Sequence, residues 1–431
     1  MKFSTETLQK VHQLLVTDFI KQMKAEEIKA VELEQTLRSN LQAIGQSMYG
    51  EMLSVMDDQE QGIEDECKCG GKGKRISKRE AQVLSVFGWT GYRRSYYQCQ
   101  ECRHRWVGLD EKLGLRAGQA TELMSGLLGL AGITVSFEEA RRQIEQYLQV
   151  DVSANTIRQE TQRIGEKQAI REQEWIAQSE DLGYLQERER QAERPKRMYG
   201  SIDGAFVPLE NEWKEAKTVS WYQAGSRYGS TRLHAQEMAY YTSLDPADTF
   251  GSLLWGTGVH HQSDRAEELI FVCDGAAWIW NLVKQYFPDA VQIVDWYHAC
   301  QYLYPVADAL FCSVEEQNNW ITEMKTFLWN GEVEIVIQEC RLRLSQVGPP
   351  AERLISYYTN NQERMRYDLF RAKDYLIGSG TVESACKQII SMRLKRSGAR
   401  WTHQGASLTA KARTAWLSNS WNSITQLPLA V

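Results

Sequence analysis

The stretch IFVCDGAAWIWNLVKQYFPDAVQIVDWYHA, residues 270–299, places an acid directly after each of two apolar runs. Asp274 follows the first run and Asp295 follows the second, and a segment with the length and pattern of an amphipathic helix lies between them. Short apolar runs separated by such a segment predict two buried strands joined by a helix. Because functional groups gather at one edge of a sheet of this kind, both aspartates are candidate site residues.

Three further apolar runs precede this stretch, in MYGSIDGAFVPL, EAKTVSWYQAG and AQEMAYYTSL, and they predict a β-meander. The following DPADTFGSLLWGTG predicts a helix that is capped by Asp245 or Asp248 and ends at Gly256. Residues 313–370 show a polar helical pattern without strand signals. A meander followed by alternating helices and strands predicts a mixed α/β fold.

Two more acids extend the candidate site. Asp203 lies inside the first meander strand, where a carboxylate is costly unless it is paired or binds a metal. Glu383 lies in the first turn of a helix that follows a glycine-serine loop. With Asp274 these acids offer oxygen ligands for Mg²⁺, and two such ions promote in-line phosphoryl transfer. Each also has an ordinary explanation, namely turn formation for the aspartates and the helix dipole for Glu383.

Four of the nine cysteines form two close pairs, Cys67 and Cys69 in CKCGG and Cys99 and Cys102 in CQEC. Such a set resembles a zinc ribbon, in which four thiolates enclose a structural Zn²⁺ ion. The C-x-C spacing of the first pair is shorter than the C-x-x-C spacing of the second. A structural Zn²⁺ is expected here, because disulfides are rare in a reducing compartment.

The net charge of −6 conceals an uneven distribution, since no Asp or Glu follows Glu383. The acid-free block predicts a surface for DNA phosphates, although a merely solvated helix face is the alternative. Its candidate DNA-binding residues are Lys387, Arg393, Lys395, Arg396 and Arg400. Arg93 and Arg94 are further candidates beside the cysteine pairs, where Tyr96 and Tyr97 suit either base stacking or a small core.

Residues 136–165 predict a helix, a short turn and a second helix, with Ser153 as the cap of the second. A helix-turn-helix presents its second helix to the major groove of DNA, but helix pairs of this shape are also common without DNA. The side chains expected on the exposed face are Thr156, Arg158, Gln159 and Gln162.

The segments SIDGAFV, CDGAAW, YFPDAVQIVDWYHA and GSGTVESACKQIISMRLKRSGARWT resemble the catalytic blocks of bacterial insertion-sequence transposases of the ISKra type, and more distantly those of Mutator-type transposases. The resemblance implies a ribonuclease-H-like core with a helical insertion. It also implies a catalytic triad of Asp203, Asp274 and Glu383 that holds two Mg²⁺ or Mn²⁺ ions. Asp295 and His298 match an accessory motif, in which His298 would orient the scissile phosphate or be a core histidine. Asp295 would be a fourth ligand or the partner of His298.

The same resemblance gives an expected division of the chain into six parts. These are an N-terminal helical region at 1–60, a zinc-ribbon-like module at 61–110, a helix-turn-helix-like region at 111–175, the first part of the catalytic core at 196–304, a helical insertion at 305–370 and the second part of the core at 371–431.

The expected function is DNA cleavage at transposon ends followed by strand transfer. The expected partners are the terminal inverted repeats, target DNA and further copies of the chain in a homodimer or larger assembly, with the N-terminal helices as candidates for the contact. A metal-dependent nuclease or resolvase on the same fold, or an inactive DNA-binding derivative, are the alternatives. No membrane span or signal peptide is apparent in the sequence, which predicts a cytoplasmic protein associated with the bacterial nucleoid.

Overall fold

The computed structural model describes residues 4–22, 29–59, 67–190, 193–226 and 233–425. The chain divides into two compact units, Met1–Thr121 with Gln146–Val150, and Glu122–Glu145 with Asp151–Val431. Helices predominate and a mixed sheet is present, so the expected mixed α/β class is confirmed. None of the described helices is both long and apolar enough to cross a membrane.

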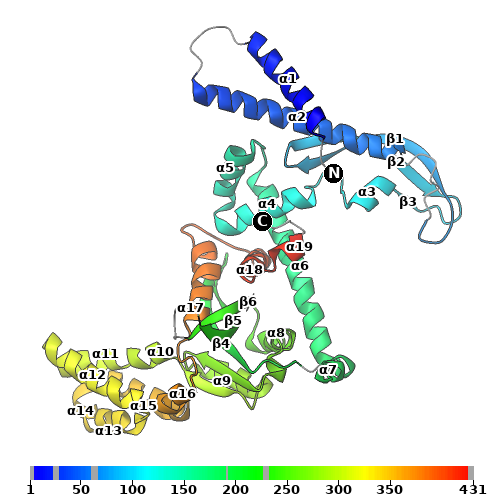
Figure 1. The fold of residues 1–431 in the computed structure, drawn as a ribbon. Coiled ribbons are helices and arrows are strands. Elements are labelled where there is room, and N and C mark those ends of the chain that lie inside the picture. The colour runs from blue at the N-terminus through cyan, green and yellow to red at the C-terminus, as the bar shows by residue number, and fades with distance from the viewer. Residues whose placement is uncertain (1–3, 23–28, 60–66, 191–192, 227–232, 426–431) are drawn as a thin grey trace. The chain divides into compact units, whose positions relative to one another are not determined.

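The first unit joins helices to a three-stranded antiparallel sheet (Figure 1). Its elements are α1 (Thr5–Gln22), α2 (Ala30–Gln59), β1 (Gly73–Ser85), β2 (Gly88–Cys99), β3 (Arg105–Trp106) and α3 (Gly108–Leu113). Leu53 on α2 packs with Val83 and Tyr92 of the hairpin in a small buried core. The approach is close because a Cβ at Gly50 would lie 2.3 Å from the carbonyl oxygen of Gly91.

The second unit contains a five-stranded sheet in the order β6-β5-β4-β7-β8. Its first three strands form the antiparallel meander that the sequence predicts, and β7 and β8 run parallel to β4. A helix, α9 (Ala277–Tyr286), connects the two parallel strands as predicted. The strands are β4 (Arg197–Pro208), β5 (Trp213–Ser226), β6 (Leu233–Ser243), β7 (Glu268–Cys273) and β8 (Val291–Val294).

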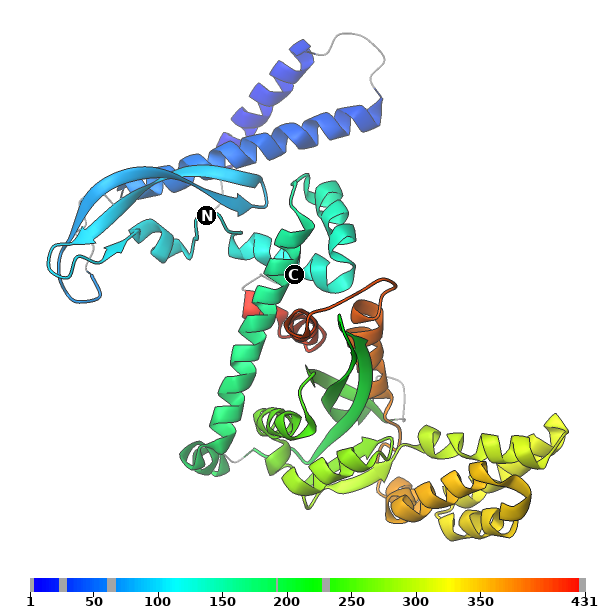
Figure 2. The ribbon, with the colours of Figure 1, turned by 180° about the vertical axis from the view of Figure 1, so that it is seen from behind.

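Helices cover both faces of this sheet (Figure 2). Ile202 and Val207 are five residues apart on β4. Because side chains alternate between the two faces of a strand, these two point to opposite faces of the sheet. Ile202 packs with α8 (Ala247–His260) and α9, whereas Val207 packs with the helices that follow Glu383. Those helices are α17 (Gly380–Cys386), the π-helical segment η3 (Lys387–Leu394) and α18 (His403–Leu417).

A stretch of helices without strands separates β8 from α17, and it is coloured yellow to orange in Figure 1. It includes the polar region in which the sequence predicts only helices. Its elements are α10 (Trp296–Gln301), α11 (Leu303–Leu310), α12 (Val314–Trp329), α13 (Val333–Leu342), α14 (Leu344–Val347), α15 (Pro349–Asn361), η2 (Gln362–Met365) and α16 (Tyr367–Ala372).

The predicted helix-turn-helix pattern corresponds to α5 (Phe137–Leu148) and α6 (Ala154–Glu180). The Ser153 hydroxyl caps α6 by accepting from the N–H of Thr156 at 3.0 Å. However, α6 continues well beyond the predicted pair and packs along α8 and α18. The other helices among the described residues are α4 (Glu122–Thr134), α7 (Leu182–Glu189), η1 (Ser263–Arg265) and α19 (Trp421–Thr425).

The prediction for the boundaries of α8 is wrong. Neither Asp245 nor Asp248 caps the helix, whose N-cap is Pro246, and the helix passes through Gly256 to end at His260. Gly256 is buried against α6, where an added Cβ would lie 2.8 Å from the side chain of Ile176. The glycine permits close helix packing instead of ending the helix.

Candidate functional site

Three aspartates lie level with one another across the parallel half of the second unit's sheet. The parallel pairing of β4 with β7 places Gly200 opposite Phe271. Continued for three residues along both strands, the same register places Asp203 opposite Asp274. The β7–β8 register pairs the last residues of both strands, so Asp274 and Asp295, which follow them, are level as well. Since neighbouring strands lie about 4.8 Å apart, the sheet alone brings three carboxyl groups to one edge.

Asp203 and Asp274 form a like-charged pair. The Oδ1 atom of Asp203 accepts from the N–H of Gly204 at 2.7 Å, and that of Asp274 accepts from the N–H of Ala276 at 2.9 Å. Burial raises the pKa of Asp203, and the negative charge of Asp274 raises it further. Within the described parts of the chain, no Lys or Arg side chain forms an ion pair with either carboxylate. Such a pair lacks the positive charge that a bound divalent cation supplies.

Asp295 is fully buried and its two carboxylate oxygens are already occupied. Oδ1 accepts from the backbone N–H of His298 at 2.7 Å, which makes Asp295 the N-cap of α10, and it lies 3.2 Å from the ring Nδ1. Oδ2 accepts from the N–H of Ser379 at 2.5 Å. Burial opposes ionisation, but these hydrogen bonds outweigh it and lower the pKa of Asp295. Of the two roles left open, partner of His298 and metal ligand, the geometry favours the first.

His298 links Asp295 to Glu383. Its Nδ1 atom lies 3.6 Å from Oε1 of Glu383, and the ligand atoms of all three residues lie within 4.8 Å of one another. The hydrogen bond with Asp295, followed by the nearby charge of Glu383, raises the pKa of His298. His298 is half-buried and faces carboxylates, so it belongs to this acidic cluster and is not an isolated core histidine.

Glu383 reaches the sheet edge through α17. Two residues before Glu383, the hydroxyl oxygen of Thr381 lies 3.2 Å from that of Ser220 on β5. The hydroxyl of Ser379 donates to Glu383 Oε1 at 3.1 Å. One turn later on the same helix, the thiol of Cys386 lies within hydrogen-bonding reach of Asp203. The Glu383 carboxylate is exposed, and Asp203 and Asp274 stand outside its tight cluster with His298. The three triad acids thus face the same edge without direct contact.

Two residues of this region were not predicted from the sequence. The hydroxyl of Tyr357 on α15 donates to the carbonyl oxygen of Asp274, and the backbone of Ser379 binds Asp295. The glycines around Ser379 gave a signal of a tight loop, but nothing in the sequence near Tyr357 indicated its contact.

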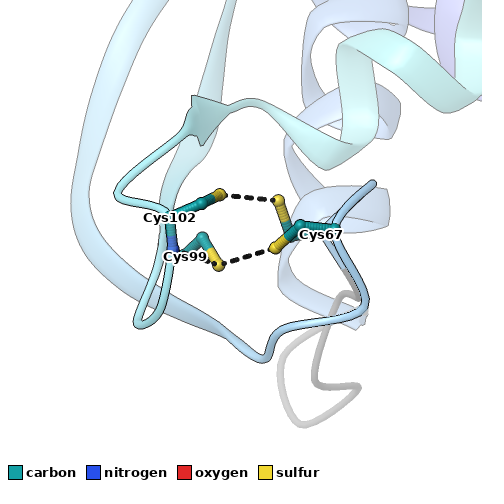
Figure 3. Close-up of side chains that lie close together, drawn as sticks. Cys67, Cys99 and Cys102 are labelled. Carbon is teal, nitrogen blue, oxygen red and sulfur yellow. Dashed lines mark hydrogen bonds between the residues drawn. The ribbon is translucent and has the colours of Figure 1, made fainter.

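The four paired cysteines of the first unit come together at the open end of its hairpin (Figure 3). The Sγ atoms of Cys67 and Cys102 lie 3.5 Å apart, as do those of Cys69 and Cys99, and all four lie within 4.8 Å of one another. Tetrahedral Zn–S bonds of about 2.3 Å place sulfur atoms roughly 3.8 Å apart, so the donor set fits a metal such as zinc. The short C-x-C spacing is therefore compatible with a four-thiolate site.

Backbone geometry supports this cluster. The N–H of Cys102 points to Cys99 Sγ at 3.4 Å, and hydrogen bonds from the N–H groups of Cys102 and Glu101 lower the pKa of Cys99 to about 7. A stabilised thiolate is the form that binds a metal. Without a metal, only Cys99 of the cluster is of this kind, since the pKa values of the other three, Cys67, Cys69 and Cys102, are raised. All nine cysteines are free thiols in the structure.

The candidate DNA-binding residues beside the cysteines differ in accessibility. Arg93 is exposed, whereas Arg94 is largely buried in an ion pair with Asp110. Tyr97 belongs to the small core around the cysteines. Tyr96 is partly exposed and lies under the guanidinium of Arg79, 4.4 Å from the ring centroid.

In the second unit, Gln159 is exposed on α6 and Thr156 is partly exposed, while Arg158 binds the side chains of Asn155 and Gln162 on its own helix. After Glu383, the exposed cations are Lys387, Lys395 and Arg400.

Two arginines of the acid-free block take part in contacts within the fold. Arg396 is half-buried and pairs with Glu139 at 3.0 Å. Arg393 differs from the expected surface cation, because it is buried between Phe137 and Trp401 and donates to the carbonyl of Gly132 at 2.7 Å. Burial lowers the pKa of Arg393 to about 9, and its side chain is used for packing.

Residues 23–342 match the model of an uncharacterised protein family, UPF0236. The chain belongs to this family. The matched segment contains the cysteine cluster, the three level aspartates and His298, and it ends before Glu383. No protein of curated function matches the chain. Membership of UPF0236 therefore assigns no activity, and a functional proposal depends on the chemistry of the sites.

Proposed function

We propose that this protein is an insertion-sequence transposase of the ISKra type, which cleaves DNA at the ends of its element and joins them to target DNA. The observation that carries the proposal is the level alignment of Asp203 and Asp274 on neighbouring strands, with Glu383 brought to the same edge by α17. A meander followed by two parallel strands, with a long helical segment before the third acid, supports a ribonuclease-H-like core.

The carboxylates fit hard divalent cations. Asp203, Asp274 and Glu383 would hold two Mg²⁺ or Mn²⁺ ions, because these metals prefer oxygen ligands and the acids lack Lys or Arg partners in the described structure. When bound, such ions activate a water or hydroxyl nucleophile and stabilise the leaving oxygen of a phosphodiester. Asp295 would act as the partner of His298, since both of its oxygens accept hydrogen bonds from N–H groups.

His298 would position the scissile phosphate. Its raised pKa favours the protonated ring, which can donate to a phosphate oxygen beside Glu383. Asp295 would fix the orientation of that ring through its contact with Nδ1, and it would fix the loop before α17 through Ser379.

Sequence-independent binding of DNA would come from exposed cations near the acids. Lys387, Lys395 and Arg400 follow Glu383 along the chain, and no acid follows any of them. Contacts of this kind with phosphates supply affinity that falls steeply with salt. The hairpin of the first unit, with its structural Zn²⁺ and exposed Arg93, would bind DNA as a separate module.

The N-terminal helices would assemble two copies, as the pairing of two element ends requires. From Leu33 onward, exposed apolar side chains recur on α2 at intervals of three, four or seven residues, and the Leu14 side chain on α1 is 72% exposed. Such a stripe is typical of helices that pair with a partner helix. The exposed large apolar side chains of α2 are Val31, Leu33, Leu37, Leu41, Met48, Met52 and Val55.

The first test is metal-dependent nicking of a duplex that carries the sequences flanking the gene. Wild-type protein is expected to cut at the repeat boundary with Mg²⁺ or Mn²⁺, and Asp274→Asn is expected to lose at least about 100-fold in rate. Asp289→Asn is a matched control, because Asp289 is an exposed acid in the loop between α9 and β8. Equal cutting by wild type and Asp274→Asn would show that Asp274 is not catalytic.

Strand transfer separates the transposase from a nuclease on the same fold. Pre-cut ends with free 3′-hydroxyl groups are expected to be joined to a target plasmid by wild type and not by Asp274→Asn. Nicking without any joining would assign the protein to the nuclease class.

A further inference from the structure

A cavity of about 600 Å³ lies between α9 and α15, directly beside the loop that carries Asp274. Gly275 forms part of its wall and has a φ of +94°, and a Cβ at this position would lie 2.5 Å from the Tyr357 hydroxyl. The same hydroxyl donates to the carbonyl oxygen of Asp274. The cavity wall and the acid are therefore parts of one rigid loop, and the volume suits a small planar ligand.

Aromatic rings form two sides of the cavity. Tyr302 and Tyr357 stack with their ring centroids 4.0 Å apart and their planes at 13°. Trp280 lines the cavity from α9, and the guanidinium of Arg364 lies 4.8 Å from its ring centroid. The partly exposed rings of Tyr302 and Tyr357 offer a flat surface for a second π-system at little entropic cost, whereas Trp280 is buried beneath Arg364.

The polar groups of the cavity are close to neutral overall. The lining side chains of Asn281, Ser356 and Asn360 make no hydrogen bond within the described structure, so amide and hydroxyl groups remain available to a ligand. Arg364 already donates to Gln292 at 2.7 Å and to groups on α15.

The charged groups of the lining nearly balance. The carboxylate of Glu352 shares the lining with the guanidinium groups of Arg353 and Arg364, so the net charge of the lining is +1. Arg364 already donates to Gln292 and packs on Trp280. Aromatic faces together with neutral donors and acceptors match the edge and face of a nucleobase better than they match a phosphate.

We propose that this cavity binds a nucleobase of the substrate DNA, unstacked from the duplex next to the phosphate that the acids cleave. The inference rests on the proposed function, because the acids position the phosphate and the cavity lies beside Asp274. Tyr302 would stack on the base, and Asn360 would bind its polar edge. Asn360 is exposed on α15, so its replacement tests the cavity without disturbing the core.

The first experiment measures binding of a fluorescent mononucleotide, 2-aminopurine deoxyriboside 5′-monophosphate, to the full-length protein without added divalent cation. Asn360→Leu and Tyr302→Ala are expected to bind about tenfold more weakly than wild type. Thr359→Leu, on the same helix but outside the cavity lining, is the matched control and is expected to bind like wild type. The absence of saturable binding by wild type, or equal binding by all variants, overturns the inference.

The second experiment compares nicking of a normal duplex with that of a duplex lacking one base beside the cut. Asn360→Leu is expected to nick the normal duplex about tenfold more slowly than wild type, and removal of the base is expected to abolish this difference. Normal nicking by Asn360→Leu overturns the inference and leaves the proposed function standing. A wild type that binds the mononucleotide through Asn360 but never nicks supports the cavity as a nucleobase site and overturns the proposed function instead.

Discussion

The cysteine cluster and the acidic site are built over very different lengths of chain. The four cysteines lie between residues 67 and 102 and meet at the open end of one hairpin. The acids lie between residues 203 and 383 and meet only because strand register, a helix cap and α17 bring them to one edge. A metal can organise the first site by itself, whereas the second depends on the packing of an entire unit.

Each site therefore has its own characteristic weakness. Loss of one thiolate removes one of the four metal ligands. The hydrophobic core around the cysteines is small, so the fold there depends on the metal. Loss of one carboxylate at the sheet edge leaves a large core intact and changes mainly chemistry. Three substitutions or conditions test this contrast.

The largest effect is expected at the cysteine cluster. Cys99→Ser should lose stoichiometric zinc and unfold the hairpin of the first unit, because structural zinc contributes on the order of 10 kcal/mol of binding energy to small folds. Zinc content and limited proteolysis around residues 67–106 measure this. Cys312→Ser, which changes an exposed thiol outside the cluster, should leave both unchanged. Retained zinc in Cys99→Ser would remove this residue from the ligand set.

A smaller effect on stability is expected from Asp295→Ala. The substitution leaves the buried N–H groups of His298 and Ser379 without acceptors, which should lower the free energy of unfolding of the second unit by about 3 kcal/mol. Urea denaturation measures this difference, with Asp289→Ala as the exposed control. Equal midpoints for wild type and Asp295→Ala would contradict the role of Asp295 in holding the edge together.

The smallest effect is expected from mild acid acting on two histidines remote from the acids. Burial lowers the pKa of His260 to about 4 and that of His261 to about 3, and His261 Nε2 lies 2.7 Å from the hydroxyl of Tyr241. Both pKa values are lower than that of histidine in the unfolded chain, so the unfolded chain binds protons first as the pH falls. The contribution of the two neutral histidines to stability is complete above about pH 6.5 and decreases as the pH falls towards 4. Each histidine contributes at most about 1.4 kcal/mol per pH unit.

The measurement is the free energy of unfolding at pH 6.5 and at pH 5, in a range above the usual carboxylate titration. His261→Gln should show a smaller loss over this interval than wild type. An unchanged pH dependence in His261→Gln would show that this imidazole is not protonated on unfolding.

Prediction from sequence succeeded where a signal is local. The meander, the helix between the parallel strands and the cap at Ser153 depend on side-chain alternation and on hydrogen bonds within a few residues. It failed where a residue's neighbours are distant in sequence. Gly256 was interpreted as the end of a helix although it accommodates α6, and Arg393 was interpreted as a DNA contact although it fills a buried site.

The sequence by itself determined the mixed α/β class, the two cysteine pairs, and the positions of Asp274 and Asp295 after apolar runs. These features follow from local periodicity and from the preferences of residue types. Tertiary structure alone decided that Asp203 is level with Asp274, that the oxygens of Asp295 are occupied, and that Tyr357 holds the Asp274 loop. Register, burial and contacts between distant helices set these relations, because each depends on packing free energy summed over a whole unit.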